Sequence, residues 1–267
     1  ALNKDLVGAA LPQATRKHPE SLILVLVMNT HTVESSPDLP NELRGYANEL
    51  AAAQRRLGAP AADLAILLNL ILKKSITRDQ ICDLLEKSWT HLQNLREILD
   101  SLSQTRTADT SFVTVLVGIS KAARSDDSFS LTKVARLLRE VEVHFSDTSD
   151  NTFSRATLAE ARALLSCLER DYESAAEHYR TAADASRDDD QVHWRFQSER
   201  AITLCDLGRE SFDDEPLLAA INLYETIAAE LTDEVNEPGR WAITQADLGN
   251  ALGILGHRRD QSTRFGE

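Results

Sequence analysis

The sequence of 267 residues predicts an all-α protein, in which a helical N-terminal domain is followed by a short array of helical hairpins. Three observations support this fold class. Only ten Gly and seven Pro occur among abundant Ala, Leu and Glu, a composition that favours helix. Apolar residues recur at helical spacing over long stretches of the first half. The second half repeats itself at intervals that are typical of stacked helical units.

In the first half, the periodicity of apolar residues locates the helices. Gly58 and Pro60 predict a turn between two of them, because Gly tolerates a left-handed conformation and Pro starts helices. From Ile81 to Leu102 the apolar residues follow in steps of three and four, which indicates one long helix with a single buried face. Residues 21–28 are rich in residues that favour strands, but Pro19 before them suits a helix start, so we expect a buried helix here. The helices expected here span 21–28, 41–57, 60–74, 81–102, 110–124 and 130–145.

A polar connector, Ser146–Ser154, predicts the boundary between two domains, residues 1–150 and residues 151–267. The net charge of −13 is unevenly divided between them. The first part has 17 Lys and Arg against 19 Asp and Glu, and the second has 12 Arg against 23 acidic residues. A strongly acidic half is a poor partner for nucleic acid or anionic lipid, so we expect a solvated surface rather than a groove for basic partners.

The cysteines predict a reducing, cytoplasmic environment. Cys82, Cys167 and Cys205 are odd in number, lie far apart and form no CxxC motif, which argues against a disulfide framework and a zinc ribbon. No signal peptide is visible at the beginning of the chain. The longest apolar run, Leu22–Met28, is far too short to span a bilayer, so we expect no membrane partner.

Two markers recur in the second half with the same pair of intervals, 38 and 48 residues. The first marker is a small residue inside a helix, at Ala163, Ala201 and Gly249. The second marker is the position that ends this helix, at Arg170, Gly208 and Gly256. Equal intervals for two independent markers indicate a structural repeat, and repeats of this length form solenoids.

These segments resemble the tetratricopeptide repeat, a two-helix unit with small residues where its helices cross and an aromatic residue on the second helix. The first unit matches at Ala163, Ala175, Tyr179 and Ala182, with Tyr172 opening its second helix. The second unit matches at Ala201, Leu204, Gly208, Ala220 and Tyr224, after an inserted "ESFDDEP" that is expected to lengthen the turn. The third unit matches at Leu248, Gly249, Leu252 and Gly256.

The resemblance covers about Phe153 to Gln261 and includes departures from the family pattern. Arg170 stands where Gly is usual, and Arg162 and Arg200 replace an expected Leu. Trp194 and Trp241 recur before two units, as in some long-period bacterial versions of the repeat.

The third unit contains only its first helix, Trp241–Gln261, which follows an interruption of the helical pattern expected at Pro238 and Gly239. Small residues at the helix crossings let two backbones approach closely, so Gly249→Leu is expected to overpack this unit. We therefore expect about two and a half units, truncated at the C-terminal end, with further repeats or domains of the same polypeptide beyond Glu267.

The resemblance implies a function in binding another protein or a peptide, as a scaffold or adaptor, on the concave face that the first helices line. The groove positions that it assigns are Arg195, Ser198, Ile202, Ile243, Ala246 and Asn250, preceded by Thr157, Glu160 and Leu164 in the first unit. In the family, Asn at the position of Asn250 often binds a peptide backbone. The basic set that clamps a C-terminal carboxylate is absent, because Glu160 and Leu164 stand where it would begin. Packing of these residues against the N-terminal helices or further repeats remains an alternative.

No catalytic or metal-binding motif is found, so we expect no enzyme activity, cofactor or metal. HExxH, GxSxG, P-loop and dinucleotide motifs are missing. Glu140 and His144 share one helical face but lack further ligands, and Arg187–Asp190 is expected to be a solvated loop with an Asp that caps the next helix.

Two alternative functions remain open. Residues 76–99 resemble a helix-turn-helix faintly, which would make the protein a transcription regulator with the repeats as its sensor. One continuous helix is the preferred interpretation, because Glu86 and Lys87 do not fit the turn. The second alternative is that the chain is the regulatory arm of a larger multidomain enzyme.

Overall fold

The computed structural model describes residues 52–71, 78–104, 115, 117–119, 121, 131–146, 152–211 and 213–265. Every regular element among them is a helix and none of these residues forms a strand, which confirms the all-α prediction for the described residues. The chain divides into two compact units, residues 1–94 with 124–129 and residues 95–123 with 130–267. The predicted helix at 21–28 lies outside the described residues.

In the first unit, Gly58 forms the predicted turn between residues 52–57 and α5, Ala61–Ile71. Gly58 has φ 62°, a left-handed conformation that Gly adopts without steric strain, and its amide donates to the carbonyl of Gln54 over 2.9 Å.

The long helix predicted next is α6, Arg78–Ser103, and it is continuous. Its apolar positions are buried at helical spacing, as predicted: Ile81, Leu85, Trp89, Leu92, Leu95, Leu99 and Leu102. The helix contains no turn at Glu86 and Lys87, so residues 78–103 do not form a helix-turn-helix.

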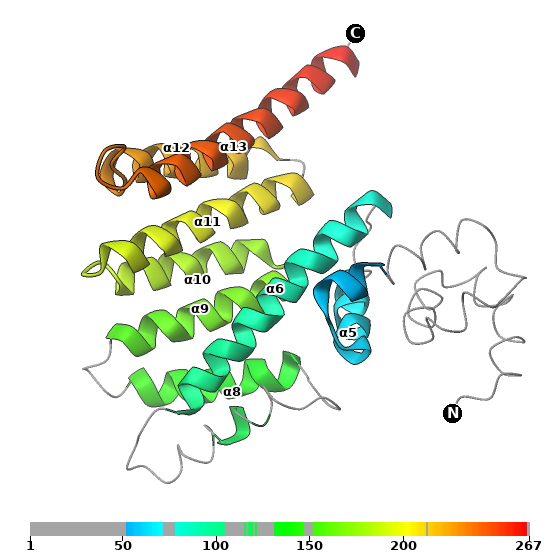
Figure 1. Ribbon diagram of the computed structural model, residues 1–267, viewed down its shortest axis with the longest axis vertical. Helices are drawn as coiled ribbons and strands as arrows, with labels where there is room; N and C mark the ends of the chain where they lie inside the picture. The colour runs from blue at the N-terminus through cyan, green and yellow to red at the C-terminus, as the bar shows by residue number, and fades with distance from the viewer. Residues whose placement is uncertain are drawn as a thin grey trace, which may run out of the picture. The chain divides into compact units, whose positions relative to one another are not determined.

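From residue 131 onward, the second unit contains six described helices, each of which packs against the next along the chain (Figure 1). They are α8 (Leu131–Ser146), α9 (Thr152–Leu168), α10 (Tyr172–Ala185), α11 (Asp190–Ser211), α12 (Asp214–Glu230) and α13 (Pro238–Phe265). α13 also contacts α11. The predicted domain boundary falls between α8 and α9, on residues 147–151 that the structure does not describe, and stays a prediction.

Two equivalent cores hold the pairs α9–α10 and α11–α12 together. The first contains Ala163, Cys167, Tyr172, Ala175 and Tyr179. The second contains Ala201, Cys205, Leu217, Ala220 and Tyr224. Equivalent residues are 38 apart on the first helices and 45 apart on the second ones. Burial of each large side chain stabilises the fold by about 1.5–3 kcal/mol, so matched cores supply matched stability.

Aspartates end the turns that lead into α10 and α11. The carboxylate of Asp171 accepts a hydrogen bond from the Ser174 amide over 3.2 Å at the start of α10. Asp189 accepts from the Val192 amide over 3.0 Å before Trp194. Side-chain acceptors satisfy amides that have no partner within the first helical turn, so the expectation of a capping Asp in the 187–190 loop is confirmed.

Two expected turns are helical in the structure. α11 continues to Ser211 and α12 begins at Asp214, so the insertion Glu210–Pro216 extends the two helices and does not lengthen the turn. The pair Pro238–Gly239 does not break the chain before the last helix but lies in the first turn of α13. Proline is tolerated there, because its missing amide would have no intrahelical partner.

The expectation that Gly249 lies at a crowded helix crossing is wrong. Ala163 and Ala201 are completely buried, but Gly249 is exposed, and a Cβ built on it meets no described atom within 4 Å. A crossing needs a second helix, and no described helix packs on this side of α13. Gly249→Leu is therefore not expected to overpack the described structure.

The contacts between consecutive pairs repeat with the predicted intervals. Arg258 of α13 donates from Nη2 to the carbonyl of Gly208 over 2.6 Å and from Nη1 to the carbonyl of Asp213 over 2.8 Å. One pair earlier, Glu210 of α11 forms an ion pair with Arg170. Glu210 and Arg258 are 48 residues apart, and Arg170 and Gly208 are 38 apart. The register of the repeat thus appears in tertiary contacts as well as in the cores.

Candidate functional site: the α11–α13 face

The predicted groove residues lie on two helices that a partly buried hydrogen bond joins. Trp194 of α11 donates from Nε1 to Oγ1 of Thr244 in α13 over 3.2 Å, and Thr244 is almost completely buried. The guanidinium of Arg240 lies 5.6 Å from the centre of the Trp194 ring. This contact fixes the relative position of the two helices beside the candidate site, which we name the α11–α13 face: Arg195, Ser198, Ile202, Ile243, Ala246 and Asn250.

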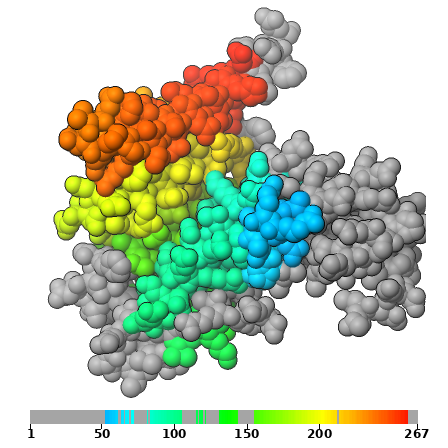
Figure 2. Space-filling view, in the orientation of Figure 1, coloured from blue at the N-terminus to red at the C-terminus, as the bar shows by residue number. Residues whose placement is uncertain are grey.

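The α13 part of this face is open. Ile243, Ala246 and Asn250 are spaced by three and four residues, which places them on one side of the helix, and all three are exposed. Ile243 is 52% exposed. The side-chain amide of Asn250 makes no hydrogen bond to any residue that the structure describes. In Figure 2 the atoms of α13, orange to red, form one end of the stack of helices in this unit.

The α11 part is more enclosed. Arg195 is held by an ion pair with Glu160 of α9, in which Nη2 lies 3.1 Å from Oε2, and its guanidinium lies 4.2 Å from the centre of the Phe196 ring. Ser198 is buried, and Ile202 packs against the α11–α12 core. Of the three α11 positions, Arg195 is thus the exposed one.

In the first repeat, on α9, internal contacts occupy the corresponding positions. Leu164 is 3% exposed and belongs to the buried core. The Glu160 carboxylate, also mostly buried, pairs with Arg195, so that the two charges compensate each other. The residues that the family resemblance assigns therefore divide into two groups. Those on α9 are packed against other residues, and those on α13 are exposed.

Asp247 lies beside the face, and the sequence interpretation missed it. It is four residues after Ile243 and three before Asn250, a helical spacing that was the available signal. Partial burial raises the pKa of its carboxyl above the usual range of Asp, because a carboxylate loses solvation there.

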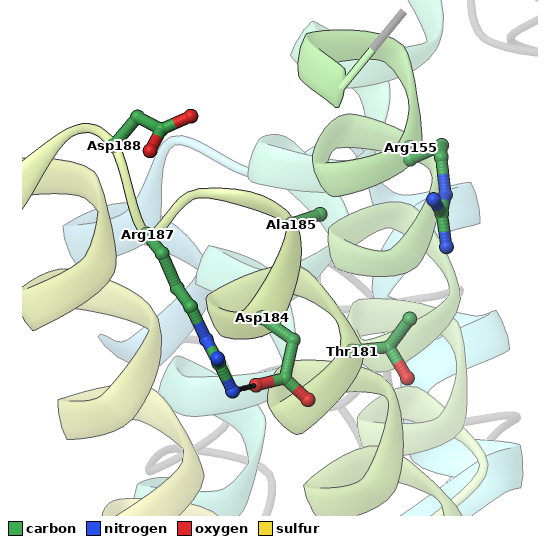
Figure 3. Close-up of a pocket in the computed structure, with 6 residues that line it drawn as sticks. All are labelled: Arg155, Thr181, Asp184, Ala185, Arg187 and Asp188. Carbon is green, nitrogen blue, oxygen red and sulfur yellow. Dashed lines mark hydrogen bonds and ion pairs between the residues drawn. The ribbon is translucent and has the colours of Figure 1, made fainter. Parts of the chain in front are cut away.

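A hollow away from this face, between α9, α10 and the turn after α10, offers no defined binding chemistry (Figure 3). Its charged lining residues are Arg155, Asp184, Arg187 and Asp188, two of each sign. Arg187 already pairs with Asp184, Nη2 to Oδ1, over 2.7 Å. The hollow is open, and its charges cancel.

Other classes of site find no support in the described part of the chain. Its His, Cys, Asp and Glu side chains form no group of three or more that could hold a metal ion. None of the described helices has the length and apolar character needed to cross a membrane. Cys167 and Cys205 are buried free thiols.

Comparison with known proteins adds no assignment. No family model, no curated protein and no solved structure matches the chain. The candidate site therefore depends on its own geometry.

Proposed function

We propose that this chain is a protein-binding module without enzyme activity, whose C-terminal half is a tetratricopeptide-like solenoid that binds an extended polypeptide on the α11–α13 face. The observation that carries the proposal is the exposed pair of Ile243 and Asn250 on one side of α13. A large exposed aliphatic side chain beside a free amide offers both apolar area and hydrogen bonds, a combination typical of interaction sites. The matched cores and contacts of successive helical pairs support the solenoid.

Binding would depend on complementarity to a surface that exists before the partner arrives. The Asn250 amide can donate to a peptide carbonyl and accept from a peptide amide at once, which a backbone requires. Ile243 and Ala246 would pack against an apolar side chain of the bound segment. Arg195 is held in place by Glu160 and Phe196, so its ordering would cost less entropy on binding than that of a free arginine.

Selection from a displayed library of random peptides tests this proposal. Peptides enriched on the wild-type chain should bind the double variant Ile243→Asp/Asn250→Ala at least about tenfold more weakly, because the variant removes the apolar contact and the amide. Arg195 is left unchanged, since its loss would also break the ion pair with Glu160. The matched control is Val235→Asp, which changes another exposed aliphatic residue, in the segment before α13.

Retained binding to Val235→Asp together with loss on the double variant supports the α11–α13 face. Failure to enrich any peptide, or equal binding to all three proteins, would contradict the proposal. The melting temperature of each variant shows that the fold is intact.

A further inference from the structure

The side of α13 that carries Gly249, Leu252, Gly253 and Gly256 is exposed at all four positions. We name it the α13 outer face. It adjoins the α11–α13 face at Gly249 and Gly253, but Leu252 and Gly256 face away from Ile243. A Cβ built on any of the three glycines meets no described atom within 4 Å. Leu252, a large apolar residue, is 49% exposed.

The equivalent positions of the two preceding units are covered. In α11 they are Ala201, Leu204, Cys205 and Gly208, and in α9 and the turn after it they are Ala163, Ser166, Cys167 and Arg170. All are buried except Leu204, which is partly buried and packs against the α11–α12 core. The same register thus yields two covered faces and one open face.

The cover in both cases is the helix that follows. At Gly208 a Cβ would lie 2.6 Å from Cγ of Leu217 in α12, so these two helices are in direct contact. α10 and α12 place matching residues against the covered faces, and these residues are buried: Tyr172, Ala175, Tyr179 and Ala182 on α10, and Leu217, Ala220, Tyr224 and Ile227 on α12. Both sets fall at i, i+3, i+7 and i+10.

This chemistry defines an occupant: an amphipathic helix with a bulky residue at i, Ala at i+3, Tyr at i+7 and a small or aliphatic residue at i+10. The Ala lets this helix approach the small residues of the helix that it covers. The bulky residue fills the space beside the glycine of the second repeat marker, which is Gly208 on α11 and Gly256 on α13. Gly256 leaves the same space open on α13 that Leu217 fills beside Gly208.

The chain has no spare segment with this pattern. Its four tyrosines are Tyr46, Tyr172, Tyr179 and Tyr224. Tyr46 has Leu39 seven residues before it, but Glu42 stands where Ala is required. Tyr179 and Tyr224 already cover α9 and α11, and a second copy would have these residues buried in the same way.

We propose that the α13 outer face binds an amphipathic partner helix from outside residues 1–267, packed as α12 packs on α11. The interface continues the established succession of helical pairs by one more helix. Gly249 and Gly253 each lie one helical turn after a member of the α11–α13 face, so the outer face borders the proposed peptide site, and the residues that respond to a bound probe distinguish the two.

Nuclear magnetic resonance with a synthetic helix tests this proposal on the full chain. The probe is a peptide with the sequence of residues 213–231, which carries Leu217, Ala220, Tyr224 and Ile227. Its addition should shift the amide resonances of Gly249, Gly253 and Gly256 and the methyl resonances of Leu252. A control peptide with Ala220→Glu should bind at least about tenfold more weakly, because a long charged side chain would stand at the crossing.

Two variants of the chain complete the test. Gly256→Leu should weaken peptide binding about tenfold or more by filling the space for the bulky residue, and its own fold should persist, since no described atom lies within 4 Å of the new Cβ. Val235→Asp, which changes an exposed residue before α13, should leave this binding unchanged. The helical circular dichroism and the melting temperature report folding in both.

Three outcomes would overturn the inference. The first is the absence of any shift at peptide concentrations up to about 1 mM, where even weak complexes form. The second is a shift confined to Ile243 and Asn250, which would leave the proposed peptide site standing. The third is a concentration-dependent shift of the glycine amides without peptide, which would identify a second copy as the occupant.

Discussion

Arg170 and Glu210 tie the turn after α9 to the last turn of α11. Nε of Arg170 donates to Oε1 of Glu210 over 2.6 Å, and the side chain of Arg170 is 7% exposed. Arg170 has φ 57°, a left-handed conformation in which Gly would be unstrained. Arg170 therefore adopts a strained backbone conformation, and its side chain forms a mostly buried contact between two helical pairs.

Replacement of Arg170 should separate these two effects. We expect Arg170→Ala to lower the free energy of unfolding by about 1–3 kcal/mol, because it leaves the partly buried Glu210 carboxylate without this partner. Arg170→Gly should lose about 1 kcal/mol less, since Gly relieves the strain at φ 57°. Urea denaturation measures both, and Glu210→Gln serves as the partner variant in a double-mutant cycle. Equal losses for Ala and Gly would show that strain is unimportant here.

Gly208 and Gly256 occupy equivalent positions and should respond oppositely to the same substitution. Gly208→Ala places Cβ 2.6 Å from Leu217 Cγ, so we expect a loss of about 1–3 kcal/mol through overpacking. Gly256→Ala meets no described atom within 4 Å and should raise stability by up to about 1 kcal/mol through helix propensity. Thermal unfolding of the two variants provides the comparison. A destabilised Gly256→Ala would mean that this side of α13 is already covered.

Three buried tyrosines should ionise only when the protein unfolds. Burial raises the pKa of the hydroxyls of Tyr172, Tyr179 and Tyr224 far above that of exposed tyrosine. Because the folded pKa is raised, the stabilisation is complete below the unfolded pKa of about 10 and is lost as the pH rises above it. Tyrosinate absorbance should therefore increase for these residues together with the loss of helical circular dichroism.

In the alkaline titration, Tyr224→Phe should lower the tyrosinate absorbance that accompanies unfolding by the contribution of one tyrosine. Ionisation of all tyrosines near pH 10 with the helical signal intact would contradict the buried cores.

Asp247 and Asp233 should have opposite effects when changed to Asn. Burial raises the pKa of Asp247, so its charged form opposes folding above the unfolded pKa of about 4. Asp247→Asn should then raise the melting temperature at pH 7, and the gain should vanish below pH about 4.

Asp233 is the matched control for Asp247. Hydrogen bonds from the backbone amide and side chain of Asn236, and from the backbone amide of Val235, lower the pKa of Asp233. A lowered pKa contributes stability above the unfolded pKa that is lost as the pH falls, so Asp233→Asn should lower the melting temperature at pH 7. The same sign for both variants would refute the assigned environments.

The helices of this protein were predictable because their signals are local. The buried stripe of α6 from Ile81 to Leu102 and the Gly58 turn appear where the periodicity and the turn residues place them. The ends of α11, α12 and α13 were misplaced, because Asp213 as a cap and Pro238 in a first turn permit helix where the composition indicated a break. Helix boundaries depend on which amides find acceptors, and several arrangements fit one sequence.

The candidate site was only partly predictable. Arg195, Ile243, Ala246 and Asn250 are exposed, but Ser198 is buried and Ile202 packs in a core, a difference that periodicity does not distinguish. The pairing of Arg195 with Glu160 joins residues 35 apart and depends on how two helical pairs stack. Contacts of this range follow from tertiary packing and leave no mark on local spacing.

By itself, the sequence determined the helical class and the 38- and 48-residue register, because both follow from side chains that recur along one chain. Only the tertiary structure decided which members of that register are covered. Ala163, Ala201 and Gly249 are equivalent in the sequence, yet the first two are buried beneath a following helix and the third is open. Burial belongs to a pair of helices, so one helix's residues cannot specify it.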